Sequence, residues 1–113
     1  MKCKRLVQRL GFQVGITARG AQAALMILAP HGKEGGRDNA HRGADQWLYV
    51  MQGTGLARVN RRRIPLSAGT LLLIQQGDRH EIRNTGRKSL KTINFYTPPA
   101  YRPDGTPRAQ GRP

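Results

Sequence analysis

Two polar segments of the sequence each carry a histidine, and together they could form one chemical site. Imidazole nitrogens and amide oxygens can ligate a divalent metal ion or hydrogen-bond a polar small molecule. The first segment holds Asn39, His41, Asp45 and Gln46, and the second holds His80 and Asn84. These six residues are therefore the first candidates for a functional site.

Alternation along β-strands predicts which of these side chains point inward. Successive side chains of a strand point to opposite faces, so His80 shares a face with Ile82, and Gln46 shares a face with Leu48. If the two apolar residues face the core, His80 and Gln46 point inward together. Asp45 lies on the opposite face of its strand.

The sequence predicts that strands and turns position these residues. Short apolar runs are separated by Gly, Asn, Asp and Pro, which is typical of an all-β protein. We expect strands at residues 13–17, 22–29, 47–51, 55–60, 64–66, 70–75, 80–84 and 90–96. Residues 31–44 are polar and rich in Gly, and they predict a loop or a loosely ordered strand.

The length of 113 residues predicts a single domain. We expect a basic arm or edge strand at residues 1–12, a barrel at residues 13–102 and a disordered tail at residues 103–113, which is rich in Pro, Gly and Arg. The lone Cys3, the lack of a signal-peptide pattern and the shortness of every apolar run predict a cytoplasmic location and no membrane partner.

The charge is strongly basic, with 20 Lys and Arg against 6 Asp and Glu. These cations are scattered along strands, turns and both ends without interleaved aromatic residues, so we expect a solvated basic surface rather than a nucleic-acid partner. The acidic residues, in contrast, are clustered in the sequence. Five of them flank the histidine segments, namely Glu34, Asp38, Asp45, Asp78 and Glu81.

The two segments resemble the two motifs of the cupin superfamily. Gly69, Gly77, His80 and Asn84 match the second motif, with Gln75 where a proline is usual. His41 and Gly53 match the first motif, while Asn39 stands where the first histidine is usual and Gln46 stands where an acid is usual. The resemblance spans roughly residues 22–105 and implies a small antiparallel jelly-roll β-barrel.

The resemblance also implies a cofactor and an assembly. Metal-binding cupins hold a divalent transition metal such as Mn, Fe, Ni or Zn, here with His41 and His80 as ligands and with Gln46 and Asn39 as weaker ones. This set is neutral and lacks the charge compensation of a carboxylate, so the sequence leaves the metal open. Small cupins commonly pair, so we expect a homodimer.

We therefore predict a barrel that binds a small polar or anionic molecule in its interior, with Asn84, Asp45 and Tyr49 as further ligand-binding residues. With a metal, the site could be that of an enzyme in which the ion polarises a substrate oxygen. The alternative is a metal-free, non-enzymatic sensing or interaction module whose basic surface takes an acidic partner or nucleic acid. The sequence does not choose between them.

Overall fold

The computed structural model describes residues 1–36 and 43–108, and every regular element in that part of the chain is a β-strand. The strands are β1 (Gly11–Thr17), β2 (Gln22–Leu28), β3 (Lys33–Gly35), β4 (Asp45–Gln52), β5 (Thr54–Val59), β6 (Arg62–Ser67), β7 (Leu71–Ile74), β8 (His80–Asn84) and β9 (Leu90–Thr97). The eight predicted strands are confirmed to within two residues at each end. The additional strand, β3, lies in the segment predicted as a loop or a loosely ordered strand.

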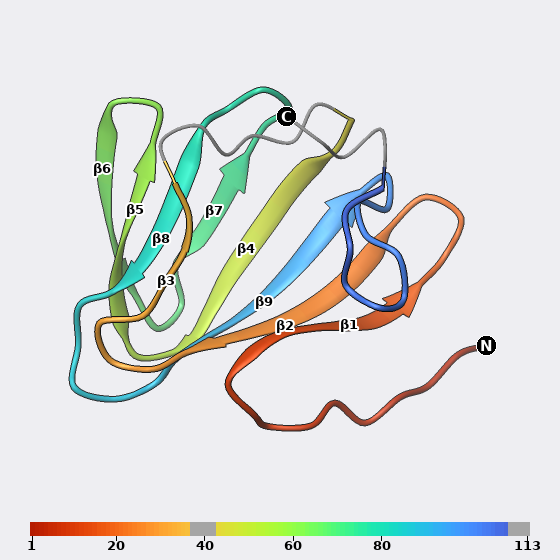
Figure 1. The fold of residues 1–113 in the computed structure, drawn as a ribbon, viewed down its shortest axis with the longest axis horizontal. Helices are drawn as coiled ribbons and strands as arrows, with labels where there is room; N and C mark the ends of the chain where they lie inside the picture. The colour runs from red at the N-terminus through yellow and green to blue at the C-terminus, as the bar shows by residue number, and fades with distance from the viewer. Residues whose placement is uncertain (37–42, 109–113) are drawn as a thin grey trace.

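The strands form two antiparallel sheets (Figure 1). One sheet has the order β1-β2-β9-β4-β7 and the other the order β3-β8-β5-β6, so strands distant in sequence become neighbours. The prediction of an all-β antiparallel fold is confirmed. Because β4 and β8 belong to different sheets, Gln46 on β4 and His80 on β8 approach the interior from opposite sides.

Glycine is required at the turns that frame β7. Gly69 precedes this strand with a φ of 94°, and Gly77 follows it with a φ of 85°. A side chain at such an angle is strained, so these positions need glycine. The spacing of Gly69 and Gly77 in the second motif therefore corresponds to two sharp turns, one at each end of the short strand β7.

The interior between the sheets divides into an apolar end and a polar end. At the apolar end, buried side chains from both sheets pack together, among them Leu48, Val50, Ala57, Leu66, Ile74 and Leu90. Burying each large aliphatic side chain contributes about 1.5–3 kcal/mol to stability. At the polar end, Gln46 and His80 are only 4% and 3% exposed. The predicted inward orientation of both residues is thereby confirmed.

Residues after β9 fold back against the polar end. The backbone of Arg102 is hydrogen-bonded to Thr106, and Arg108 N donates to Ala100 O over 2.8 Å. The side chain of Gln22 holds this segment, because its Oε1 accepts from Tyr101 N over 2.9 Å. In the part of the chain that the structure describes, there is no helix long and apolar enough to cross a membrane.

Candidate functional site

A cavity of about 300 Å³ lies at the polar end of the barrel. Its wall combines both sheets and the returning C-terminal segment, and it consists of Phe12, Met26, Glu34, Gln46, His80, Ile82, Tyr96, Tyr101, Gly105 and Pro107. Pockets that take small molecules start at about this volume. At roughly 30 Å³ of liquid volume per water molecule, the space suits a ligand of about ten non-hydrogen atoms.

A chain of hydrogen bonds fixes the orientation of the Gln46 amide. The hydroxyl of Thr92 donates to Met26 O over 3.3 Å and accepts from Asn94 Nδ2 over 3.0 Å. Asn94 therefore presents its Oδ1 to Gln46, whose Nε2 donates to it over 2.9 Å. Since each donor and acceptor along the chain is determined by the next, the amide cannot be flipped without losing these bonds.

The remaining amide atom of Gln46 is a buried acceptor. Its Oε1 is shielded from solvent and has no hydrogen-bond partner within the described residues. Leaving a buried polar atom unpaired costs about 1–3 kcal/mol, so buried polar atoms nearly always find a partner. Because Gln46 lines the cavity, a molecule in that space can supply the missing donor.

His80 lies on the opposite wall of the same cavity. Its Nδ1 is 3.3 Å from the carbonyl oxygen of Asp78. A carbonyl oxygen only accepts, so Nδ1 is the donor in this contact. The ring is also held by its burial, because His80 is 3% exposed.

Three aromatic rings form another wall. The centroid of Phe12 lies 4.7 Å from that of Tyr101, which in turn lies 5.0 Å from that of Tyr96. Burial raises the pKa of Tyr101 to about 12 and raises the pKa of Tyr96 well above its usual value. A hydrogen bond between the two hydroxyls also raises the pKa of Tyr96, so both phenols stay neutral at physiological pH.

Glu34 lies in β3 at the edge of the cavity. Partial burial of its carboxyl group raises its pKa above the usual value, although the residue keeps contact with solvent. The wall of the cavity thus combines a partly desolvated carboxyl with neutral phenols, an imidazole and an amide oxygen.

The other predicted site residues lie away from this cavity or outside the described residues. Asn84 is buried at the far end of β8, where its Nδ2 donates to Leu28 O and Lys88 O and its Oδ1 accepts from Gly86 N. Asp45 Oδ1 accepts from Gln76 N over 2.9 Å, and Tyr49 is 42% exposed on the outer face of its sheet. His41 and Asn39 fall in residues 37–42, which the structure does not describe.

The described residues do not make a metal centre by themselves. Structural and catalytic metal sites usually take three or more strong donors from the protein. Among residues 1–36 and 43–108, no three His, Cys, Asp or Glu side chains come together. Of the predicted ligands, His80 and Gln46 line the same cavity, and the second of these offers only a neutral amide oxygen.

A family model for the cupin domain matches residues 24–96, which is more than half of the chain. The chain belongs to the cupin family. The match begins in β2 and ends in β9 at Tyr96, so it contains both segments that carry Gln46 and His80. The jelly-roll fold implied by the sequence motifs is confirmed.

Relatives of this cupin are distant. It is 30% identical over 67 residues to a tetracenomycin polyketide synthase protein of Streptomyces glaucescens, which is 59% of this chain and 45% of that protein. It is also 30% identical over 53 residues to an oxalate-binding protein of Thermotoga maritima, which is 47% of this chain and 44% of that protein. Each match spans less than half of the relative.

Among solved structures, the cupin resembles a protein from Bacillus halodurans with a TM-score of 0.75 and 27% identity. The superposition covers 84% of this chain and 75% of the other. The similarity therefore extends beyond the residues of the two motifs to most of the barrel.

Sequence reasoning missed part of the cavity wall. Phe12, Tyr96 and Tyr101 line the cavity but are not among the site residues predicted from the sequence. Alternation along β9 places Tyr96 on the same face as Asn94 and Thr92, which was the available signal. No local pattern indicates Tyr101, because it reaches the cavity only when residues after β9 fold back across the barrel.

Proposed function

We propose that this cupin binds a small, ring-shaped molecule that carries hydroxyl groups, in the cavity between Gln46 and His80. The observation that carries the proposal is the buried Gln46 Oε1 that lacks a donor within the described residues. A ligand hydroxyl would donate to this oxygen, and the three aromatic rings offer a face for its ring. The volume of about 300 Å³ limits the ligand to about one ring.

The orientation of the Gln46 amide argues against a ligand that only accepts hydrogen bonds. The relative from Thermotoga maritima is an oxalate-binding protein. Oxalate is a dianion without donors at neutral pH, so it would place an oxygen against the Gln46 oxygen. Repulsion between the two acceptors favours a hydroxyl-bearing ligand over oxalate in this chain.

Thermal melts with matched probes test this proposal. Resorcinol and myo-inositol carry hydroxyl donors, and 1,3-dimethoxybenzene keeps the resorcinol ring without them. We expect at least one hydroxyl probe to raise the Tm in a concentration-dependent way, since a ligand of the native state stabilises it by mass action. An equal shift with 1,3-dimethoxybenzene or oxalate, or no shift with either hydroxyl probe, contradicts the proposal.

The divalent ion expected from the family resemblance stays a prediction. His80 is the one strong donor among the described members of the predicted ligand set. Elemental analysis of protein purified without chelator tests it, with His80→Ala as the comparison. We expect any bound ion to be lost in that variant, and metal retained by His80→Ala would contradict a role for His80 as a ligand.

The predicted homodimer also stays a prediction, and the outer face of the five-stranded sheet is the surface we propose for it. Its exposed apolar side chains are contiguous, because Trp47 is paired with Leu73 and Phe95, and Tyr49 with Leu71. Exposed patches of this kind often mark interfaces between chains. Sedimentation should show a dimer that Leu71→Ser with Phe95→Ser weakens and that Leu10→Ser leaves intact.

A further inference from the structure

The four-stranded sheet carries a cationic hollow on the face that points away from the barrel interior. The hollow has a volume of about 1060 Å³. Its lining contains five cationic side chains, which are Lys33, Arg58, Arg61, Arg62 and Arg79, together with Gly36, Asn60 and Glu81. Cations that are scattered in the sequence thus meet on one surface in the fold.

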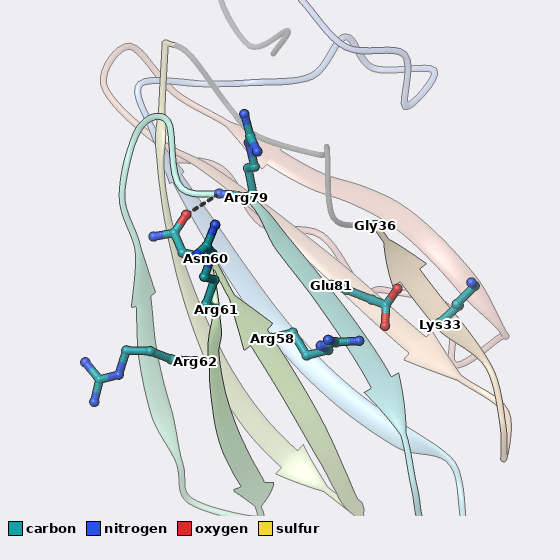
Figure 2. Close-up of a pocket in the computed structure, with 8 residues that line it drawn as sticks. All are labelled: Lys33, Gly36, Arg58, Asn60, Arg61, Arg62, Arg79 and Glu81. Atoms are coloured by element: carbon teal, nitrogen blue, oxygen red, sulfur yellow. Dashed lines mark hydrogen bonds between the residues drawn. The ribbon is translucent and has the colours of Figure 1, made fainter.

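The strand order explains how these residues meet. β8 lies between β3 and β5, so Glu81 on β8 is paired with Arg58 on one side and with Gly35 on the other, while Lys33 is paired with Arg83 (Figure 2). The turn between β5 and β6 contributes Arg61, and the turn before β8 contributes Arg79. With Arg62 at the start of β6, the positive charge comes from three strands, β3, β5 and β6, and from these two turns.

Asn60 holds these two turns together. Its backbone N donates to Arg79 O over 2.6 Å, and its side-chain Oδ1 accepts from Arg79 N over 3.1 Å (Figure 2). Its Nδ2 also donates to Asp78 Oδ1 over 3.1 Å. The backbones that carry Arg61 and Arg79 are thus fixed before any partner arrives, which lowers the entropic cost of binding.

The cations of the hollow are not paired with carboxylates in the described part of the chain. Its single acidic residue, Glu81, accepts from Arg83 Nη2 over 3.2 Å, which is the one ion pair among the described residues. The charge of that carboxylate is therefore offset by a residue outside the lining. The five lining cations remain available to an anionic partner.

The chemistry of the lining selects among polyanions. Guanidinium groups bind phosphate oxygens in a bidentate manner. None of the lining residues is aromatic, so the hollow lacks the stacking surfaces that single-stranded nucleic acids use. The lining consists mostly of hydrogen-bond donors, which suit phosphate oxygens. These features favour the phosphate backbone of double-stranded DNA.

We propose that the cationic hollow binds double-stranded DNA through its phosphates, without reading base sequence. Five neutralised phosphates would give a slope of roughly −4 to −5 when the logarithm of the affinity is plotted against that of the salt concentration. The hollow and the cavity share no lining residue, so substitutions in the hollow leave the lining of the cavity unchanged.

The test compares two triple variants that remove the same charge. Arg58, Arg61 and Arg79 are replaced by Ser in the hollow variant, and Arg19, Arg87 and Arg102, which are exposed elsewhere, are replaced by Ser in the control variant. Binding of a labelled duplex of about 20 base pairs is measured by fluorescence anisotropy across a salt series. Thermal melts confirm that both variants fold.

We expect the hollow variant to lose on the order of 100-fold in affinity near 0.1 M salt and the slope to decrease by about 2 to 3. The control variant should change affinity only a few-fold. Equal losses in both variants would overturn the proposal, as would an absence of binding near 0.1 M salt. Tighter binding of the matching single strand or of an RNA duplex than of the DNA duplex would also overturn it. The same holds if replacing the three arginines weakens binding to phosphatidylserine vesicles but not to the DNA duplex.

Discussion

Two buried amide side chains at opposite ends of the barrel differ in how completely they are hydrogen-bonded. Asn84 makes three hydrogen bonds, two from its Nδ2 and one to its Oδ1. Gln46 uses its Nε2 on Asn94 but leaves its Oε1 without a partner among the described residues. Both residues were predicted to belong to one site, yet only Gln46 lines the cavity.

This difference separates a residue that holds strands together, Asn84, from Gln46, for which we propose a role in binding. The bonds of Asn84 connect β8 with the end of β2 and with the turn before β9, so its side chain is fully used in holding strands. Gln46 Oε1 has no partner among the described residues, which costs free energy, and a donor in the cavity would remove this cost. The Gln46 oxygen without a partner among the described residues therefore supports our proposal that this end of the barrel binds the ligand.

Replacing Asn84 should have the largest effect on stability. Asn84→Ala leaves two carbonyl oxygens and one N–H without their partner, and we expect the free energy of unfolding to fall by about 3 kcal/mol. Urea unfolding measures this loss. Resorcinol affinity should stay within about twofold of the unmodified protein, because Asn84 does not line the cavity; a large loss of affinity would place Asn84 in the site after all.

Replacing Gln46 should have the opposite balance of effects, with a smaller loss of stability and a larger loss of ligand affinity. Gln46→Met preserves the length of the side chain but removes the acceptor, and it leaves Asn94 Oδ1 without its donor. We expect a loss of only about 1–2 kcal/mol in stability together with a 10- to 100-fold loss of affinity for the hydroxyl probe. Calorimetric titration and urea unfolding give the two values. Unchanged affinity in a folded variant would refute the role assigned to the amide.

We expect a smaller effect at alkaline pH, where ionisation of the buried Tyr101 lowers the free energy of unfolding. Tyr101 has a pKa of about 12 in the folded protein against an ordinary value of about 10, so the unfolded chain releases this proton first. Its stabilising contribution is complete below pH 10 and is lost as the pH rises toward 12, at up to about 1.4 kcal/mol per pH unit.

The matched variant for this effect is Tyr101→Phe, which keeps the ring and removes the ionisable group. Urea unfolding at pH 8 and pH 11 should show a smaller pH dependence in the variant than in the unmodified protein. The absorbance of tyrosinate at alkaline pH should lose the transition near pH 12. An identical pH dependence in both proteins would contradict the burial of this phenol.

Local sequence patterns predicted the strands and the inward direction of key residues. Alternation along β4 and β8 was enough to place Gln46 and His80 in the interior, because side chains of a strand strictly alternate between its faces. The glycines around β7 were recognised by their spacing, which the turns require.

Contacts between distant parts of the chain could not be predicted from these local patterns. Asn84 shares a face with His80, so alternation alone could not tell that the two lie at opposite ends of β8 with different surroundings. The orientation of the Gln46 amide depends on Thr92 and Asn94, and the cavity wall depends on Tyr101, all far away in sequence. The cationic hollow likewise arises from strand order, which scattered arginines do not reveal.

A crystal structure of the protein with resorcinol bound tests the central claim most directly. We predict a ligand hydroxyl oxygen about 2.6–3.0 Å from Gln46 Oε1, with Gln46 Nε2 still donating to Asn94 Oδ1. A ligand bound outside the cavity would contradict the claim. A flipped amide that presents Nε2 to the ligand would contradict it equally.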